Sequence, residues 1–274
     1  MSGVERVSKD GRPASERKAR LDALVVERGL AESRSLAQRL IMAGEVRVDG
    51  QVSLKPGRVV DRQASVEVAA APRFVSRGGE KLEAAVVSFG LDMRNAVCAD
   101  VGASTGGFTD CLLQHGAQRV YAIDVGHGIF HWRLRQDPRV VLLESTNVRY
   151  LNALPEQVDW ATIDASFISL TLILPVVVHW LKPDGGVLAL VKPQFEAGRQ
   201  SVGKGGVVRD PAVHHRVLEE VIASLGPIGL GPCGLIRSPL LGPKGNVEFL
   251  LWAGRGKPAA TPDVLIEEVL PPPA

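Results

Sequence analysis

The first seventy residues show the spacing of two short amphipathic helices. The apolar positions of the first helix fall on one face and are Leu21, Leu24 and Val25. Gly29 is typical of the end of such a helix, because glycine adopts the left-handed conformation at no steric cost. Ser33 predicts the N-cap of a second helix, and Gly44 predicts its end. The apolar positions of this second helix are Leu36, Ala37, Leu40 and Ile41.

A small β-hairpin is predicted directly after these helices. Val46 and Val48 alternate with polar neighbours ahead of Asp49 and Gly50. An Asp-Gly pair favours a tight hairpin turn, since both positions tolerate a positive φ. The pattern therefore predicts a small α+β domain over residues 19–68.

Polar or small residues flank this domain. Residues 1–18 are charged and interrupted by Pro, Gly and Ser, which predicts a disordered leader. The Ala- and Pro-containing segment 69–75 predicts a linker. We expect a second domain over residues 76–254 and a C-terminal tail over 255–274.

In this second domain, apolar runs of strand length alternate with helix-like stretches. Near-continuous apolar strands separated by helices favour a parallel sheet that is covered on both faces. The last two runs follow each other closely, so we expect a closing hairpin with an antiparallel strand. The fold class is therefore α/β with a Rossmann-like sheet. The predicted strands are 97–101, 120–124, 140–143, 158–163, 187–192, 233–237 and 247–252.

The composition is that of a globular protein, with 45% hydrophobic and 23% charged residues over 274 positions. The first residues contain no apolar signal segment, and no later stretch reaches about eighteen apolar residues without a charge, Pro or Gly. Cys98, Cys111 and Cys233 form no CxxC pair, which favours reduced thiols over disulfides or a zinc site. We expect a cytoplasmic protein with no metal site and no membrane partner.

The formal net charge of +2 is divided unevenly along the chain. Residues 1–70 carry 13 Lys and Arg against 10 Asp and Glu, whereas residues 71–274 carry 19 against 20. The excess of basic residues in the first part has two interpretations. These residues form a solvated basic face, or they bind a polyanionic partner of the first domain.

A glycine-rich turn follows the first predicted strand of the second domain. It runs from Asp100 to Gly107 and precedes a helix. Glycines at such a turn let a ligand approach the backbone, and the helix N-terminus offers free N–H groups. The spacing is not GxGxxG, which disfavours NAD and leaves AdoMet (S-adenosylmethionine) as the alternative. The turn residues proposed to contact the cofactor are Asp100, Gly102, Ala103, Ser104, Gly106, Gly107 and Phe108.

Asp124 closes the next predicted strand and can accept both ribose hydroxyls of an adenosine. Glu144 and Asn147, after the third strand, are candidates for the adenine edge. The structural alternative is that these polar residues only cap helices and that the glycines only serve a tight turn. Phe108 is equally compatible with a place in the core.

Several further motifs follow one another along the chain: RLDALVVERGLAESRSLAQRLIMAGEVRVDG, FVSRGGEKL, DVGASTGGFTDCLL, YAIDVGHG, NVRYL, DASFISL, LVKPQFE, GKGGVVRD and GPKGNVEF. Through these motifs, the chain from Arg20 to about Trp252 resembles the TlyA (hemolysin A-like) family of AdoMet-dependent ribosomal RNA 2′-O-ribose methyltransferases. The resemblance implies a class I AdoMet methyltransferase sheet of the FtsJ/RrmJ type. It also implies an N-terminal S-four type RNA-binding domain (αL motif) and ribosomal RNA or ribosomal subunits as partners.

Arginines of the first domain are candidates for phosphate contacts, because a row of cations matches a nucleic-acid backbone by charge. These are Arg20, Arg34, Arg39 and Arg47.

The resemblance further implies a Lys-Asp-Lys-Glu tetrad, which maps onto Lys81, Asp164, Lys192 and Glu248. A ribose hydroxyl is a poor acid, so a base must be held at it while the methyl is presented in line. We assign Lys192 as the base, Lys81 as its electrostatic partner, and the two carboxylates as groups that fix the lysines; Asp164 also belongs to the predicted cofactor contacts. Which lysine takes the proton stays open, and a purely structural ion-pair cluster is the alternative.

Other methyl acceptors fit the sequence less well. Methylation of an exocyclic amine usually shows Asp or Asn, two prolines and an aromatic residue after the fourth strand, and here the prolines are missing from Asp164 to Phe167. Carbon methylation of pyrimidines needs a nucleophilic cysteine, and Cys233 lies outside the matching motifs. Relatives commonly have DVGYGQLAW where this chain has DVGHGIFHW, so His127 and Ile129 are expected to alter the edge of the cofactor pocket.

Two other classes of function remain as alternatives. A membrane-lytic protein is suggested by the historical family name, but no spanning segment or long basic amphipathic helix supports it. A non-catalytic RNA-binding or ribosome-assembly factor needs neither the tetrad nor the glycine turn.

Overall fold

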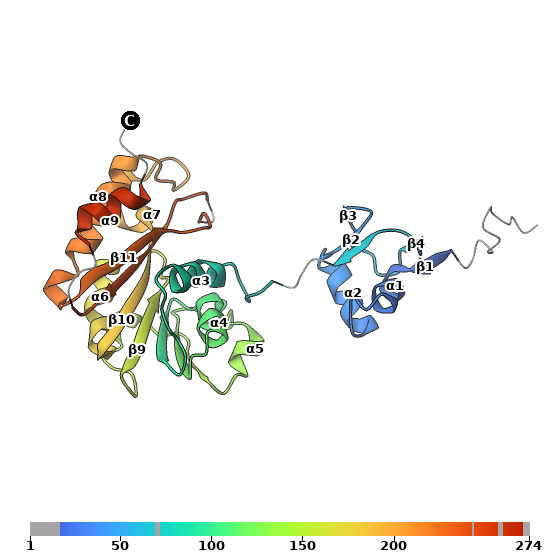
Figure 1. The fold of residues 1–274 in the computed structure, drawn as a ribbon, viewed down its shortest axis with the longest axis horizontal. Coiled ribbons are helices and arrows are strands. Elements are labelled where there is room, and N and C mark those ends of the chain that lie inside the picture. The colour runs from blue at the N-terminus through green and yellow to red at the C-terminus, as the bar shows by residue number, and fades with distance from the viewer. Residues whose placement is uncertain (1–16, 69–71, 243, 257–259, 271–274) are drawn as a thin grey trace, which may run out of the picture. The chain divides into compact units, whose positions relative to one another are not determined.

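The computed structural model describes residues 17–68, 72–242, 244–256 and 260–270. The chain divides into two compact units, Met1–Arg73 and Phe74–Ala274 (Figure 1). Most of the expected leader, residues 1–16, lies outside the described residues. Lys18, which we placed in that leader, instead belongs to strand β1, where it pairs with Asp61.

The first unit has the two helices and the hairpin that the sequence predicts. Ser33 caps α2 by accepting a hydrogen bond from the Leu36 N–H at 3.3 Å, and Gly44 has φ +78° just beyond the helix. Strands β1 and β4 form one small sheet, and a second sheet has the order β3-β2-β5. The elements are β1 Lys18–Arg20, α1 Leu21–Glu27, α2 Arg34–Met42, β2 Val46–Val48, β3 Gln51–Val52, β4 Val59–Asp61 and β5 Val66–Val68.

A buried carboxylate joins the two helices of this unit. Asp22 is fully buried and lies 2.9 Å from Arg20 Nη2 and 3.2 Å from Arg34 Nε, and it accepts a hydrogen bond from Gln38 Nε2 at 3.0 Å. These partners, above all Arg20, hold the pKa of the Asp22 carboxyl well below its usual range.

The second unit is built on a seven-stranded sheet with the order β11-β12-β10-β9-β6-β7-β8. Neighbouring strands from β10 to β8 are parallel, and β12 runs antiparallel to both β10 and β11. The strands are β6 Val97–Val101, β7 Arg119–Ile123, β8 Val140–Leu143, β9 Val158–Ile163, β10 Leu181–Val191, β11 Gly231–Arg237 and β12 Phe249–Gly254.

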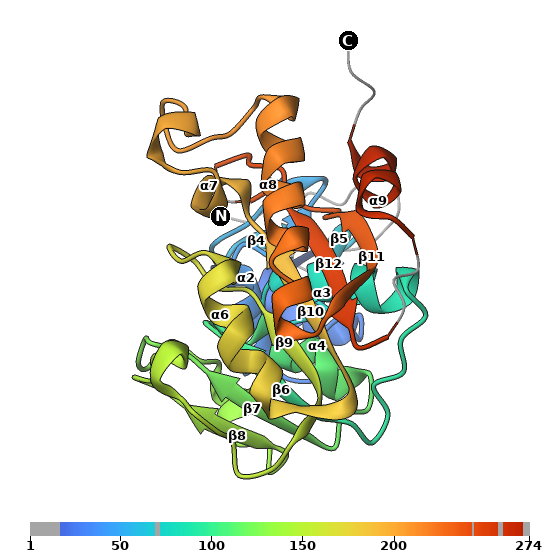
Figure 2. The same cartoon turned by 90° about the vertical axis from the view of Figure 1, so that its left-hand side faces the viewer.

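Helices cover both faces of this sheet (Figure 2). Apolar residues of α6, α8 and α9 share one buried cluster with one side of the strands, and those of α3, α4 and α5 share a second cluster with the other side. The helices are α3 Gly78–Ser88, α4 Gly107–Gln114, α5 Trp132–Arg135, α6 Leu170–Val177, α7 Pro193–Glu196, α8 Pro211–Ala223 and α9 Pro262–Val269. Short 3-10 turns lie at Val148–Tyr150, Val178–Trp180, Arg199–Ser201 and Gly226–Ile228.

The predicted fold class is confirmed, and the largest differences lie at the end of the chain and in β10. The expected tail contains α9, whose Leu265 and Ile266 are buried in the main core. Strand β10 begins at Leu181, earlier than its apolar run, because a shift of register lets the polar segment before Gly186 continue the strand. Among the described residues, no helix combines the length and apolar character that a membrane crossing requires.

The buried Asp22 generates a prediction about the stability of the first unit. Asp22→Asn removes the charge that Arg20 and Arg34 neutralise, so we expect the free energy of unfolding at pH 7 to fall by about 1–3 kcal/mol. A carboxylate whose pKa is lowered by folding stabilises the fold above its unfolded pKa of about 3.9, and this contribution is lost as the pH falls. The difference in the free energy of unfolding between wild type and Asp22→Asn should therefore become smaller as the pH falls towards 3.

Amide hydrogen exchange of the α1 and α2 residues in the full chain measures this gap directly. Glu32→Gln, at an exposed position, is the control and should leave the exchange unchanged. Equal protection in Asp22→Asn and wild type at pH 7 would contradict the prediction.

Candidate functional site

The centre of the site is the place where two turns meet at the carboxyl ends of β6 and β9. These strands are neighbours in the sheet although β7 and β8 separate them in the chain. Gly102, with φ +82°, lies so close to the second turn that a Cβ atom on it would be 2.7 Å from the carbonyl oxygen of Asp164. The order of the strands in the sheet changes direction between β6 and β9. Open α/β sheets bind their ligands at such a point.

A cavity of about 640 Å³ opens on one side of this contact. It is lined by Asp124 at the end of β7, by Asn147 after β8, and by Asp164 and Phe167 after β9. Apolar side chains that complete its wall are Val125, Ile129, Val148, Ile168 and Leu172. Its volume and mixed lining suit a nucleoside-sized ligand.

Asp124 organises the floor of this cavity. Its Oδ2 accepts a hydrogen bond from the Ser104 N–H at 2.7 Å, and its Oδ1 accepts one from the Gly126 N–H at 2.6 Å. Each carboxylate oxygen has a second lone pair, so the residue keeps the capacity to accept two hydroxyls. Asp124 thus ties the glycine-rich turn to the loop after β7, in addition to lining the cavity.

Of the two candidates for the adenine edge, only one lines the cavity. Asn147 lines the cavity, although its Oδ1 also caps a 3-10 turn by accepting the Arg149 N–H at 3.1 Å. Glu144 does not line it: its carboxylate pairs with Arg135 and accepts the Gly128 N–H, and Arg135 above all lowers the pKa of Glu144 to about 2. Of the two departures from the family pattern, Ile129 lines the cavity, and His127 Nδ1 lies 3.3 Å from Glu144.

Asp100 is not at the cavity surface, which corrects our expectation of a direct cofactor contact. Its side chain is fully buried and accepts hydrogen bonds from Thr109 Oγ1 at 2.6 Å and Thr162 Oγ1 at 3.2 Å. Burial raises the pKa of this carboxyl to about 7, against the opposing effect of the Thr109 hydrogen bond. Asp100 therefore joins the start of α4 to β9 beneath the turn.

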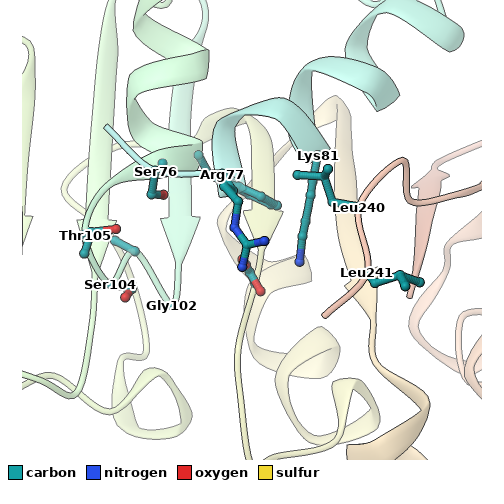
Figure 3. A pocket seen from close by; sticks show the side chains of 13 residues that line it. Ser76, Arg77, Lys81, Gly102, Ser104, Thr105, Leu240 and Leu241 are labelled. Atoms are coloured by element: carbon teal, nitrogen blue, oxygen red, sulfur yellow. The ribbon is translucent and has the colours of Figure 1, made fainter. Parts of the chain in front are cut away.

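A second, smaller cavity of about 220 Å³ lies beside the glycine-rich turn (Figure 3). Of the turn residues that we proposed, Gly102, Ala103, Ser104, Gly107 and Phe108 line it, and Phe108 is also part of the buried core. Gly106 is buried, and a Cβ atom on it would lie 2.4 Å from Leu134. The first residues of α3 form the opposite wall.

The four side chains of the predicted tetrad form two ion pairs, and of these residues Asp164 lines both cavities and Lys81 lines the smaller one. Lys192, directly after β10, has its Nζ 2.5 Å from Asp164 Oδ1. Lys81 on α3 donates a hydrogen bond to Glu248 Oε2, just before β12, at 2.6 Å. Lys81, Lys192 and Glu248 are each at least 91% buried. Burial raises the pKa of Asp164, while the Lys192 and Lys81 ammonium groups act in the opposite direction and Glu248 adds to the rise.

The sequence analysis missed three neighbours of these ion pairs. Lys192 Nζ donates to Ser166 Oγ at 3.0 Å, and Gln194 Nε2 donates to Glu248 Oε1 at 3.2 Å. The Phe195 ring lies with its centroid 5.8 Å from Lys192 Nζ and packs against the exposed Phe167 with ring centroids 4.9 Å apart. All three stand inside quoted motifs, but single polar or aromatic loop residues have no periodicity that singles them out.

The proposed phosphate contacts of the first unit fall into two groups. Arg20 and Arg34 pair with the buried Asp22, so part of their charge is neutralised within the fold. Arg39 on α2 and Arg47 on β2 are exposed, and Arg47 donates a hydrogen bond to the Gly50 carbonyl at 3.0 Å.

Comparison with protein-family models identifies the domain type of each unit. Residues 74–255 match the model of the FtsJ-like methyltransferases, and residues 19–66 match the S4 domain. The chain belongs to the FtsJ-like methyltransferase family. The resemblance that the sequence motifs indicated is thereby confirmed, and AdoMet is the methyl donor of this enzyme.

Relatives match over nearly the full chain. YqxC of Bacillus subtilis is 51% identical over 251 residues, which cover 88% of each chain. The 16S/23S rRNA (cytidine-2′-O)-methyltransferase TlyA of Mycobacterium tuberculosis is 48% identical over 240 residues, 86% of this chain and 90% of the relative. A solved structure from Streptococcus thermophilus is 42% identical, with a TM-score of 0.69 and coverage of 92% of this chain and 95% of the other.

The residues present fit AdoMet, the cofactor that the family implies. The larger cavity offers a carboxylate at Asp124 for the ribose and apolar walls at Ile129 and Val148 for the adenine. Gly102 and Ser104 line both cavities, so a ligand that extends past the turn stays in contact with the protein. Within the described part of the chain, no three His, Cys, Asp or Glu side chains gather as metal ligands do.

The geometry of Asp124 generates a prediction for cofactor binding. Asp124→Ala removes the proposed ribose acceptor and frees the Ser104 and Gly126 N–H groups, so we expect AdoMet affinity to fall about 10–100-fold. Asp124→Asn, which keeps one acceptor oxygen, should lose less. Calorimetric titration measures both affinities, and Asp92→Ala at an exposed position outside the cavities serves as the control. Wild-type affinity in Asp124→Ala would place the ribose elsewhere.

Proposed function

We propose that this enzyme methylates the 2′-hydroxyl of a ribose in ribosomal RNA. The observation that carries the proposal is the pair of lysine–carboxylate ion pairs, Lys192 with Asp164 and Lys81 with Glu248, of which Asp164 lines both cavities. A hydroxyl acceptor needs a base beside the methyl donor, whereas an exocyclic amine is served by the Asp/Asn-Pro-Pro pattern that is missing here. The TlyA relative, named as an rRNA (cytidine-2′-O)-methyltransferase, supports the same substrate class.

Lys192 takes the central role in the proposed reaction. AdoMet supplies an electrophilic methyl group on its sulfonium when it is bound. The Lys192 Nζ accepts the proton of the ribose 2′-hydroxyl as the oxygen attacks. Asp164 at 2.5 Å and Ser166 at 3.0 Å hold this nitrogen in one position, so the reacting groups need little reorganisation.

Lys81 and Glu248 form the second half of the proposed tetrad. Glu248 is held by the Lys81 ammonium through one oxygen and by the Gln194 amide through the other. The Lys81 ammonium contributes positive charge next to the oxygen on which negative charge develops. Both lysines and Glu248 are buried, and Asp164 is only partly exposed, which limits the competition of water for the same positions.

The first unit is proposed to supply RNA affinity. This proposal is supported by the match of residues 19–66 to the S4 domain. The exposed Arg39 and Arg47 provide positive charge for phosphate contacts. Arg20 and Arg34 contribute less in this proposal, because Asp22 already neutralises part of their charge. Ribosomal RNA or a ribosomal subunit is the proposed partner.

Substitution of the proposed base separates binding from chemistry. Lys192→Ala should lower turnover by about 10²–10⁴-fold, the usual contribution of a general base, while AdoMet affinity changes little. Lys81→Ala combined with Lys192→Ala should cost less than the product of the two single losses, since the residues act together.

The product decides this proposal. Labelled methyl groups from AdoMet, followed through nuclease digestion and mass spectrometry of the RNA, should be found on ribose. Lys182→Ala is the matched control, because this lysine pairs with Asp159 outside the two cavities, and it should retain full activity. Label on a base, or full turnover in Lys192→Ala, would defeat the assignment.

Truncation tests the proposed division of labour between the units. A chain that begins at Phe74 retains the elements of both cavities, so it should bind AdoMet with wild-type affinity. Its affinity for ribosomal RNA should fall by about 10-fold or more, because the phosphate contacts of the first unit are gone. Filter binding at two salt concentrations measures this loss. Undiminished RNA affinity in the truncated chain would assign recognition to the second unit.

A further inference from the structure

A glycine-rich turn between α7 and α8 presents a lysine to solvent. The Gly206 N–H donates a hydrogen bond to the Gly203 carbonyl at 3.0 Å, and the Gly203 N–H donates one to the Val207 carbonyl at 3.2 Å. These two hydrogen bonds close the turn. Lys204 lies within it, and its side chain is exposed.

A second turn, between β11 and β12, repeats this hydrogen-bond pattern. The Gly245 N–H donates to the Gly242 carbonyl at 2.8 Å, and the Gly242 N–H donates to the Asn246 carbonyl, also at 2.8 Å. This turn carries Lys244, whose side chain is exposed as well. The chain therefore builds the same kind of lysine-bearing turn at two places that are far apart in the sequence.

The second turn lies next to the tetrad. Leu240 and Leu241, directly before it, line the smaller cavity. Glu248, two residues after it, pairs with Lys81. A Cβ atom on Gly242 would lie 3.0 Å from Glu248 Cδ, so the turn packs directly on this carboxylate. Lys244 therefore extends from a turn that is in contact with one of the two ion pairs.

Asn246 joins the two turns. It is buried, its Oδ1 accepts a hydrogen bond from the Val208 N–H at 2.9 Å, and its Nδ2 donates one to the Gly206 carbonyl at 2.9 Å. A Cβ atom on Gly206 would lie 3.6 Å from Lys244 Nζ, so the Lys244 side chain lies over the turn that carries Lys204. The two turns, 203–207 and 242–246, thus form one surface, which we call the paired turns.

The positive charge of the paired turns is not neutralised within the fold. Neither Lys204 nor Lys244 has a hydrogen-bond or ion-pair partner among the residues that the structure describes. Lys182, by contrast, donates hydrogen bonds to both carboxylate oxygens of Asp159. Two like charges on adjoining turns repel each other, and a bound anion relieves this repulsion. The paired turns are therefore suited to an anionic ligand.

We propose that Lys204 and Lys244 bind phosphate groups of the RNA strand that carries the acceptor ribose. The inference rests on the proposed function, because it takes RNA as the methyl acceptor. A ribose within a strand has a phosphate on its 3′ side and another on its 5′ side, so a ribose at the tetrad brings anionic groups towards the turn on Glu248. Lysine binds phosphate as a point charge, which positions the strand without reading its sequence.

This contact has a different role from the phosphate contacts proposed for the first unit. The paired turns belong to the same unit as the tetrad, so the phosphates that they bind belong to nucleotides near the acceptor. Neither lysine is assigned a part in the transfer of the methyl group. Loss of the two charges should therefore raise the KM for RNA and leave kcat unchanged.

The salt dependence of RNA binding tests the proposal. Filter binding of ribosomal RNA by the full chain at several salt concentrations gives the slope of log affinity against log salt. Lys204→Gln combined with Lys244→Gln should make this slope shallower by about 1.4–1.8, since each neutralised phosphate contributes about 0.7–0.9. The KM for RNA should rise about 10-fold, because the affinity for the phosphate backbone falls. Unchanged AdoMet affinity shows that the double variant is folded.

Two further variants separate a phosphate contact from an effect on Glu248. Lys204→Gln alone, which leaves the turn on Glu248 intact, should change the slope by about half as much. Lys204→Arg combined with Lys244→Arg, which keeps both charges, should retain the wild-type slope. Lys182→Gln combined with Arg94→Gln is the matched control, because it removes two charges near the starts of β9 and β6, and it should also match wild type.

The possible outcomes are distinct. An unchanged slope and an unchanged KM in the double glutamine variant would overturn the inference, because the lysines would then be merely solvated. A lower kcat with an unchanged slope would overturn it as well, since the second turn would then act only through Glu248. Methylation of a base by the wild type would defeat the proposed function, but the salt slopes would still report whether the paired turns bind RNA.

Discussion

The contact between Gly102 and the backbone of Asp164 is the constraint on which the site depends. No side chain fits between these turns, because a Cβ atom at residue 102 would lie 2.7 Å from the Asp164 carbonyl oxygen. The contact brings the end of β6 against the end of β9, and it places Asp164 where the two cavities meet. A side chain at position 102 requires the backbone of Asp164 to shift, and the carboxylate of this residue is the partner of Lys192.

Two ion pairs, Lys192 with Asp164 and Lys81 with Glu248, lie largely out of water near this contact, and their burial has a cost. Removing a charge from water is unfavourable unless a partner and further hydrogen bonds compensate it. Each lysine here has a carboxylate, Lys192 has Ser166 in addition, and Glu248 has Gln194. The compensation is local, but the residues come from α3, from the turn after β9 and from the ends of β10 and β12. Stability and chemistry are therefore linked, since a change in one partner leaves another buried charge unpaired.

Much of the fold was predictable because strand-length apolar runs report burial on both faces of a sheet. The runs at 97–101, 140–143 and 158–163 match β6, β8 and β9 residue for residue. The site was predictable only in part. An aspartate at a strand end has the same sequence signature whether it faces a cavity, as Asp124 does, or the interior, as Asp100 does.

The position of β12 has a consequence for the synthesis of the chain. This strand comes last in sequence among the seven but is inserted between β10 and β11, and the residue before it, Glu248, pairs with Lys81 across 167 positions. A nascent chain in which β12 is still inside the ribosome has a gap within its sheet and an unpaired Lys81. The methyltransferase site is therefore complete only after β12 has been synthesised, long after Lys81.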